Sequence, residues 1–569
     1  MKSKKVIAIL LCLVFSLSAF AGCAPKADNT AANTPPATST APAPAPAAST
    51  APAASTAPAP AASTAPAADE ALRGGTLVVA TNSEPGSFNP VWKTDDPASI
   101  YNQNVYNKLV TLSNDYVVCP DLAKEWEISD DGLTYTFYLH DNVKWHDGTP
   151  FTSADVKFTI EAVQEFGGRM KSEWGAVETI DCPDDYTVVL NLSQPDAALL
   201  GFLAWYANQI IPKHIYEGTD WTDNPNNQSP IGTGPFKFVN WTPGVSLEFE
   251  KNTEYFMGEP YVDKLIFQII PDVATAQQAL LNGEIDYLNL TPSFSDIATL
   301  QTNPDLTVDI RTIPSRYYMG FNFGREIMQN PLVREAIATA MNKEEIYQRA
   351  FYGYNSVARG YYSPAIEWAY NDKDLAPEYD PDKANALLDE AGYPVAYNGF
   401  RMTLDLVTFQ NAAVNDMSAI LKEQLKAVGI DLNTISLESA AWTPRIRQDM
   451  DFDITITNGF HGPDPHNLYG RFATDGSGKV NGPYSNPELD QLLLDAVQES
   501  DQIKRGNMYK EVQKLLKEDH VMVPLIDLDS INVCRSYLAG TPRSEEGRAA
   551  GLTFSSFALT RFTDPALAK

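Results

Sequence analysis

The residue types that usually perform chemistry are present in this chain, but they do not form catalytic or metal-binding patterns. There are six histidines, and His461 and His466 are the only close pair. Neither a zinc-binding helix motif nor a paired Cys-x-x-Cys occurs. No Gly-x-Ser-x-Gly elbow is present, and Gly476-Ser477-Gly478 has no visible base partner. Acidic residues are too plentiful to exclude a pair suited to glycoside hydrolysis. The pattern favours binding without a metal or cofactor over catalysis.

The overall charge of the chain argues against two classes of binding partner. Lys and Arg number 42 against 72 Asp and Glu, a net charge of -30, which argues against nucleic acid or an acidic membrane surface. Of five cysteines, two lie near the start of the chain. Cys119, Cys182 and Cys534 remain, an odd number without paired spacing, so no disulfide framework is expected.

The first residues follow the order of a secretory signal. Three lysines precede an apolar run over residues 6–20, which is too short to span a bilayer comfortably. The sequence Phe20-Ala21-Gly22-Cys23 resembles the bacterial lipobox, where the signal is cut before the cysteine and the thiol receives a diacylglycerol. We therefore expect a signal peptide over 1–22 and an extracytoplasmic protein anchored to the cell membrane through Cys23. The alternative is an ordinary signal peptide with a chance cysteine.

A low-complexity segment follows the proposed anchor. Residues 24–68 are almost wholly Ala, Pro, Ser and Thr, without the large apolar side chains that a core requires. Proline makes such a segment a semi-rigid spacer, reaching on the order of 100 Å at about 3.1 Å per residue. Residues 23–71 are therefore expected to be a lipidated cysteine and linker.

The chain from Leu72 onward is long enough for at least two lobes. Residues 75–80 are typical of a strand that runs into a polar turn. Two alternating runs flank Asp130-Asp131-Gly132, which indicates a hairpin. Later, helices and strands alternate, which predicts an α/β lobe with a partly parallel sheet. The expected helices are 333–341, 382–391, 416–428, 490–498 and 504–518, and the expected strands are 403–408, 430–437, 453–457 and 521–528.

Several phrases, in order along the chain after the linker, resemble family 5 of the bacterial extracellular solute-binding proteins, the peptide, oligopeptide and nickel group. They are Gly74-Gly75-Thr76-Leu77, Lys144-Trp145-His146-Asp147-Gly148-Thr149-Pro150-Phe151, Gly232-Thr233-Gly234-Pro235-Phe236, Asn282-Gly283-Glu284-Ile285-Asp286, Val333-Arg334-Glu335-Ala336-Ile337, Tyr379-Asp380-Pro381 and Asp464-Pro465.

The resemblance implies an α/β, two-lobed periplasmic-binding-protein-like fold of type II with an extra inserted subdomain. Lobe I would comprise 72–112, 230–312 and 531–569, the inserted subdomain 113–229, and lobe II 313–530. Members of the family close around a small solute and pass it to an ABC permease driven by ATPases. We expect a monomer that binds no nucleic acid.

In peptide-binding relatives, the turn after the first strand lies in the cleft and offers backbone hydrogen bonds to the ligand, a form of strand addition. The alternative is a turn that only shapes the fold. The matching candidates are Asn82, Ser83, Glu84, Gly86 and Phe88.

The resemblance implies an opposite wall at Asn458, Gly459, Phe460 and His461. Relatives often place an aspartate just before the Asp-Pro pair to hold the ligand ammonium, where this chain has Gly462 and Pro463. Asp464 either substitutes for it or is structural.

Dipeptide binders also tend to have an arginine for the ligand carboxylate where this chain has Phe409, Gln410 and Asn411. Neutral groups at both positions favour longer peptides, capped ligands or an oligosaccharide.

Aromatic and cationic side chains complete the candidate set. Tyr and Trp suit peptide side chains and sugar rings alike, although each could instead pack in the core. The aromatic candidates are Tyr317, foremost, and Trp92, Tyr318, Tyr361, Tyr362, Trp368 and Trp442. Arg359 and Arg471 are either anion clamps or members of surface ion pairs.

The leading hypothesis is a non-enzymatic receptor of an ABC importer that captures a peptide or oligopeptide. An oligosaccharide receptor of the same fold is the alternative, and a secreted surface hydrolase is the rival from another class. Transport of nickel or haem by relatives keeps those ligands open.

Overall fold

The computed structural model describes residues 72–92, 96–167, 171, 173–205, 208–371, 373, 377–460, 462–549 and 556–567. The predicted signal peptide (1–22), the predicted lipidation site Cys23 with the linker 23–71, and the candidate His461 lie outside the described residues.

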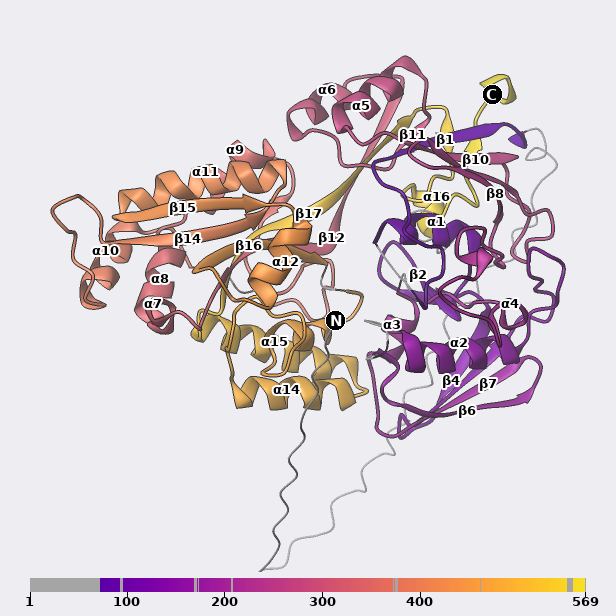
Figure 1. Ribbon diagram of the computed structural model, residues 1–569, viewed down its shortest axis with the longest axis horizontal. Coiled ribbons are helices and arrows are strands. Elements are labelled where there is room, and N and C mark those ends of the chain that lie inside the picture. The colour runs from indigo at the N-terminus through magenta and orange to yellow at the C-terminus, as the bar shows by residue number, and fades with distance from the viewer. Residues whose placement is uncertain are drawn as a thin grey trace, which may run out of the picture. The chain divides into compact units, whose positions relative to one another are not determined.

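One large mixed sheet runs through the described chain (Figure 1). It has eleven strands in the order β15-β14-β16-β12-β17-β11-β1-β10-β9-β8, with β13 paired to β17. Its strands are β1 (Thr76–Thr81), β8 (Phe236–Thr242), β9 (Ser246–Lys251), β10 (Lys264–Ile269), β11 (Tyr287–Leu288), β12 (Leu306–Phe321), β13 (Ser356–Val357), β14 (Met402–Phe409), β15 (Ile430–Leu437), β16 (Ile454–Phe460) and β17 (Met522–Arg535).

The long strands β12 and β17 join the β1 part of this sheet to the β16 part. β17 pairs with β11 near one end, and β12 pairs with β16 near the other. Their mutual register shifts between Thr312 and Arg316. At this shift the buried Arg316 side chain ion-pairs with Asp527 at 2.5 Å and donates to the carbonyl oxygens of Gly360 and Tyr362. The irregularity is therefore stabilised by an ion pair and two hydrogen bonds to carbonyl oxygens around a buried charge.

Three smaller sheets accompany the large one in the described chain, two of them between β1 and β8 in sequence and one after β17. β4 (Ala123–Ile128), β5 (Thr134–Leu139), β7 (Thr187–Leu192) and β6 (Val177–Asp184) form a four-stranded antiparallel sheet in that order. β4 and β5 flank the turn at Gly132, whose φ is 68°, so the predicted hairpin at Asp130-Asp131-Gly132 is confirmed. β2 (Val110–Leu112) pairs with β3 (Val118–Pro120), and β18 (Leu538–Ala539) with β19 (Arg561–Phe562).

Helices fill the connections. They are α1 (Asp96–Val105), α2 (Ser153–Phe166), α3 (Leu199–Leu203), α4 (Lys213–Tyr216), α5 (Val273–Asn282), α6 (Ile297–Gln301), α7 (Glu326–Gln329), α8 (Pro331–Thr339), α9 (Lys343–Phe351), α10 (Pro381–Glu390), α11 (Ala412–Ala427), α12 (Ser439–Arg447), α13 (Asn467–Phe472), α14 (Pro487–Gln498), α15 (Gln502–Glu518) and α16 (Glu545–Ala549). In the described part of the chain, no helix combines the length and the apolar character needed to cross a membrane.

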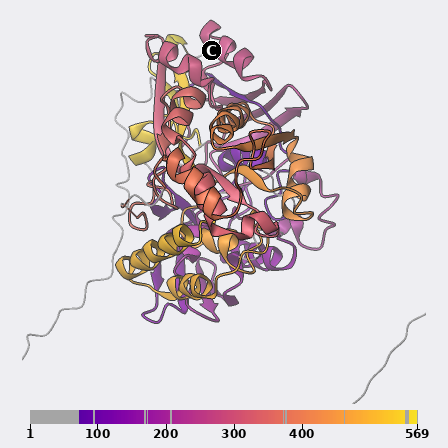
Figure 2. The same ribbon diagram turned by 90° about the vertical axis from the view of Figure 1, so that its left-hand side faces the viewer.

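The later half of the chain confirms the predicted α/β alternation (Figures 1 and 2). β14 runs parallel to β15 in unbroken register, and α11 makes the crossover between them. α11 begins at Ala412, earlier than the predicted start at Asp416. The reason is local, because the Asn411 side chain accepts a hydrogen bond from the amide of Val414 and caps the helix.

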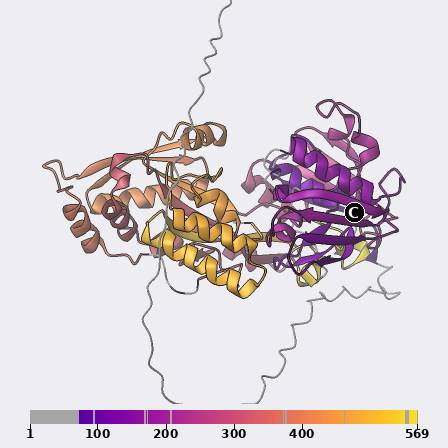
Figure 3. The same cartoon turned by 90° about the horizontal axis from the view of Figure 1, so that it is seen from below.

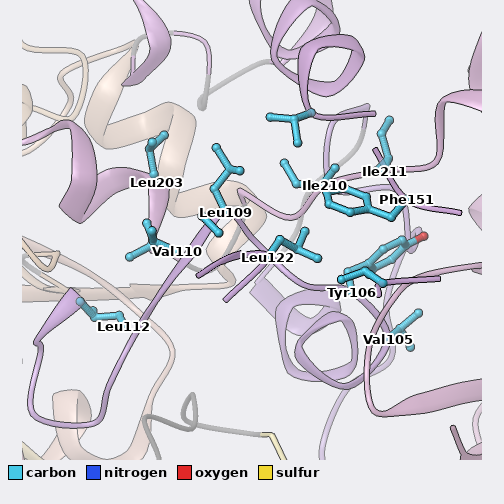
Figure 4. Close-up of a cluster of buried hydrophobic side chains, with 14 of the residues drawn as sticks. Val105, Tyr106, Leu109, Val110, Leu112, Leu122, Phe151, Leu203, Ile210 and Ile211 are labelled. Atoms are coloured by element: carbon cyan, nitrogen blue, oxygen red, sulfur yellow. The ribbon is translucent and has the colours of Figure 1, made fainter. Parts of the chain in front are cut away.

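Several hydrophobic cores hold these layers. One core unites β1, the four-stranded sheet and α2, and Figure 4 shows a part of it in which Leu203 of α3 lies with Val110 and Leu109. Two others lie in the later half, one including α8, α9 and α11 and the other including α14 and α15. Short elements such as α3 are therefore held in place by the core beneath them.

Candidate ligand-binding site

The strand register places two strand ends opposite each other. Through β11 and β17, Ala80 near the end of β1 is level with Val308 of β12. Phe460 at the end of β16 pairs with Ser315, which also belongs to β12. The two carboxyl ends therefore point toward each other along β12, about 20 Å apart at roughly 3.3 Å per residue. Ligands of open α/β sheets bind beyond the carboxyl ends of strands, which makes this gap the candidate site.

A pocket of about 950 Å³ adjoins the gap, lined by Thr312 of β12 and by Pro463 and Asp464 just after β16. Such a volume is typical of small-molecule sites. The other lining residues come from the β2–β3 hairpin, from α3 and the residues just before it, from the segment that precedes α10, and from α15. They are Leu112, Asn114, Asp115, Tyr116, Val117, Val118, Ala197, Leu200, Gly201, Ala365, Ile366, Glu367, Trp368, Gln502 and Arg505.

The candidates after β1 divide into two kinds. The Glu84 carboxylate accepts hydrogen bonds from Trp241 Nε1 at 3.1 Å and from the amide of Gly244 at 2.9 Å, which ties the turn to the β8–β9 hairpin. Phe88 is fully buried among aromatic rings. Asn82 and Gly86 are exposed, and the half-buried Ser83 donates to the Asn82 side chain. Glu84 and Phe88 shape the turn, and the exposed residues can reach a ligand.

The end of β16 offers backbone groups. Asn458, Gly459 and Phe460 pair with β12 on one edge. On the other edge, β14 and β16 share a single register pair, Leu406 with Ile454, so within the described residues no ladder joins β14 to the end of β16. Asn458 is exposed. An extended chain could add to this edge by main-chain hydrogen bonds.

The residues after β14 serve mainly the local structure. Phe409 packs edge-on against Trp442, with ring centroids 5.6 Å apart. The amide of Gln410 donates to the Leu437 carbonyl oxygen, and Asn411 caps α11. The Gln410 side chain is exposed and is therefore the one of these three best able to meet a ligand.

Asp464 is held by an arginine. The Arg505 guanidinium donates to both carboxylate oxygens at 2.6 Å and to the Ala496 carbonyl oxygen at 2.9 Å. The two side chains are only 8% and 5% exposed. A buried bidentate pair satisfies the charge of the carboxylate, so Asp464 is structural rather than an ammonium receptor.

His466, the neighbour of the candidate His461, is uncharged at neutral pH, because burial lowers the pKa of His466 to about 4. Its ring stacks on Tyr469, 5.4 Å away between centroids. In the part of the chain that is described, no three His, Cys, Asp or Glu side chains gather as a metal-ligand set.

Most of the aromatic candidates belong to the cores. Tyr317 is 6% exposed and packs against Phe351. Tyr318, Tyr361, Tyr362 and Trp442 are buried in the core that includes α14 and α15. Trp92 and Arg359 are exposed, whereas Trp368 lines the pocket.

Arg471 lies over the backbone of Gly459, where a Cβ would come 2.3 Å from its Nη2, and it donates to the Tyr318 hydroxyl. A glycine at 459 is therefore required for this close approach.

Sequence patterns did not reveal much of the pocket wall. The β2–β3 hairpin and α3 contribute a mixture of apolar and polar residues from distant parts of the chain, and nothing in their local spacing distinguishes pocket residues from core residues.

The fold and the gap between strand ends define a solute-binding protein. The family model for bacterial extracellular solute-binding proteins, family 5, middle region, matches residues 117–479. The chain belongs to this family, which captures solutes for ABC importers and is not enzymatic.

Individual relatives agree with this assignment. The oligopeptide-binding protein AppA of Bacillus subtilis is 29% identical over 466 residues, 79% of this chain and 85% of AppA. The structure of AppA in complex with a nonapeptide superposes with a TM-score of 0.74 at 28% identity, over 86% of this chain and 99% of that one.

Two further relatives bind different solutes. The structure of DppA from Helicobacter pylori, in complex with peptide STSA, gives a TM-score of 0.76 at 26% identity, over 87% of this chain and all (100%) of that one. Heme-binding protein A of Haemophilus influenzae is 27% identical over 481 residues, 79% of this chain and 86% of the relative. The mixed α/β fold expected from the sequence is therefore confirmed as that of the family.

Proposed function

We propose that this protein captures a peptide or oligopeptide between the facing ends of β1 and β16 and delivers it to a membrane permease. The observation that carries the proposal is the edge of β16 at residues 458–460, which β14 leaves without a ladder partner beside the gap. Main-chain hydrogen bonds along such an edge recognise extended peptides whatever their side chains. The peptide complexes of AppA and DppA support the same solute class.

The arrangement of charges favours peptides that are bound without a contact to their amino-terminal ammonium group. Since Arg505 engages Asp464 at both oxygens, that carboxylate is not available to a ligand ammonium. Gln410 and Asn411 stand where dipeptide binders tend to carry an arginine. Longer peptides and N-acetylated peptides are therefore expected to bind as well as free short ones.

An oligosaccharide remains the second candidate, because Trp368 lines the pocket and an aromatic face suits a sugar ring. Haem is the third, through the heme-binding relative.

A thermal-shift screen of the chain from residue 72 separates these candidates. The panel comprises peptides of two to nine residues, each free and N-acetylated, with maltooligosaccharides and hemin. A ligand present at about 100 times its Kd stabilises the folded protein by about 2.7 kcal/mol. We expect the longer peptides to raise Tm and N-acetylation to leave the shift unchanged. A shift with sugar or hemin but with no peptide would refute peptide capture.

We also propose the division and the tether suggested by the sequence. Lobe I comprises 72–112, 230–312 and 531–569, the inserted subdomain 113–229, and lobe II 313–530. Supporting this division, β12 and β17 cross from lobe I to lobe II at the register shift after Thr312. Cys23 carries the lipid anchor, and the Pro- and Ala-rich linker spaces the receptor from the membrane.

A further inference from the structure

A small contact joins the inserted subdomain to lobe II. The amide of Ala197, just before α3, donates to the Val497 carbonyl oxygen in α14 at 2.8 Å. Ala198, Phe202 and Val497 form a buried cluster of their own, separate from the larger cores. Figures 1 and 3 show α3 beside the α14 and α15 pair. We call this contact, made by residues 196–202 with Val497 and Asp464, the clasp.

The backbone of α3 also lies against the loop after β16. A Cβ at Gly201 would meet the Cβ of Asp464 at 3.5 Å and the Cγ of Pro463 at 3.7 Å. These are ordinary van der Waals distances for a Cβ, so the backbone of α3 lies close to this loop without requiring a glycine at position 201. Both segments also line the pocket, with Ala197, Leu200 and Gly201 on one side and Pro463 and Asp464 on the other.

Each half of the clasp is fixed to its own side. Leu199 and Leu203 anchor α3 in the core that the inserted subdomain shares with lobe I. Leu489, Leu493 and Ala496 anchor α14 in a core of lobe II. Among the described residues, the contact rests on one small cluster of three side chains, Ala198, Phe202 and Val497, and on the Ala197–Val497 hydrogen bond, so it can separate without disturbing either core.

An acidic side chain sits at the edge of the clasp. The Asp196 carboxylate accepts from the Ala198 amide at 2.9 Å. Burial raises the pKa of Asp196 to about 6, against the opposing hydrogen bond from the Ala198 amide, while the charge of Asp464 raises the pKa and that of Arg505 lowers it. Tyr135 and Tyr509 are the other titratable groups that face it.

We propose that this clasp holds the inserted subdomain against lobe II while solute is bound, and that it tightens when Asp196 takes up a proton. The inference rests on the proposed capture of solute between the lobes. Opening the clasp moves Asp196 into water and away from both Asp464 and Arg505. Because burial is the largest cause of its raised pKa, the open form holds its proton less tightly. By linkage, acidification between about pH 7 and pH 5 favours the closed form.

Hydrogen exchange at the Ala197 amide tests the clasp without any ligand, because this amide is protected only while its bond to Val497 is intact. After correction for intrinsic exchange, we expect protection to rise about threefold or more from pH 7 to pH 5. Asp196→Asn keeps the cap on Ala198 and should show high protection at both pH values. Unchanged protection in the wild type would overturn the proton linkage.

A matched pair of variants on α14 separates the clasp from the stability of the helix. Val497→Ala removes a clasp side chain, whereas Leu494→Ala removes one that is 39% exposed on the same helix. Val497→Ala should lower Ala197 protection about tenfold, and Leu494→Ala should leave it unchanged. Equal effects would refute the clasp.

A cysteine pair connects the clasp to solute release. In Ala197→Cys/Val497→Cys, we expect oxidation to form a disulfide, identified by peptide mapping, and to slow the release of a fluorescein-labelled nonapeptide about tenfold, reversibly on reduction. Unchanged release from the cross-linked form would overturn the clasp's role. If the nonapeptide does not bind at all while Ala197 protection behaves as stated, the proposed peptide function fails and the clasp stands.

Discussion

At the scale of single residues, the most informative side chain is Asp464. Its position just after β16 makes it a candidate for holding a ligand ammonium, and its residue type alone cannot distinguish that role from a structural one. The distinction depends on Arg505, which reaches it from α15 and donates to both carboxylate oxygens. The same contact explains how a buried aspartate is tolerated beside the pocket.

Removing the arginine should leave the aspartate buried and uncompensated. We expect Arg505→Met to lower the free energy of unfolding by about 3–5 kcal/mol, measured by urea denaturation at neutral pH. Arg349→Met is the control, because Arg349 and its partner Glu423 are 44% and 63% exposed. It should cost less than about 1 kcal/mol. Similar losses in the two variants would contradict the buried pair.

At the scale of elements, strand ends and helix caps position the candidate residues. Asn411 follows β14 at the expected wall of the cleft, yet its side chain caps α11. Glu84 follows β1 in the same way and binds the β8–β9 hairpin. Polar residues at strand ends therefore divide between holding the fold and facing the solute, and exposed neighbours such as Gln410 and Asn82 are left for the second task.

The cap can be tested directly. Asn411→Ala should lower the free energy of unfolding by about 1 kcal/mol, because the Val414 amide loses its acceptor. Asn411→Asp should keep most of this stabilisation, because an aspartate can cap the helix in the same way. Chemical denaturation measures the difference. Gln410→Ala, which removes an exposed side chain, should change stability by less than about 0.5 kcal/mol. A larger loss of unfolding free energy for Gln410→Ala than for Asn411→Ala would contradict the structural role of Asn411.

At the scale of the whole molecule, β12 and β17 determine where a solute can bind. Because both strands run through the large sheet, they bring the end of β1 and the end of β16 toward one gap. The register shift beside Arg316 falls in this gap. A change of angle between the two proposed lobes would concentrate at such an irregular point, since regular ladder pairs resist bending.

The proposed anchor places this receptor at the membrane. Cys23→Ala should move the protein from the membrane fraction to the soluble fraction, measured by fractionation and immunoblotting of cells that express the full chain. Cys182→Ala, in a described and folded part of the chain, should stay with the membrane. Retention of Cys23→Ala at the membrane would refute lipidation.

Much of the fold was predictable because its signals are local. Apolar periodicity predicted the alternating strands and helices of the later half, and the Asp-Asp-Gly turn predicted the β4–β5 hairpin. Helix starts were less predictable, since α11 begins where a side chain caps it.

The sequence by itself determined the class of protein, since ordered family phrases and local periodicity are properties of the chain. Only the tertiary structure decided which polar residues are free to meet a solute. Glu84, Asn411 and Asp464 found structural partners, two of them distant in sequence, and Phe88 and Tyr317 entered the cores. The physical reason is that burial and pairing depend on what folds against a residue, and spacing along the chain does not encode it.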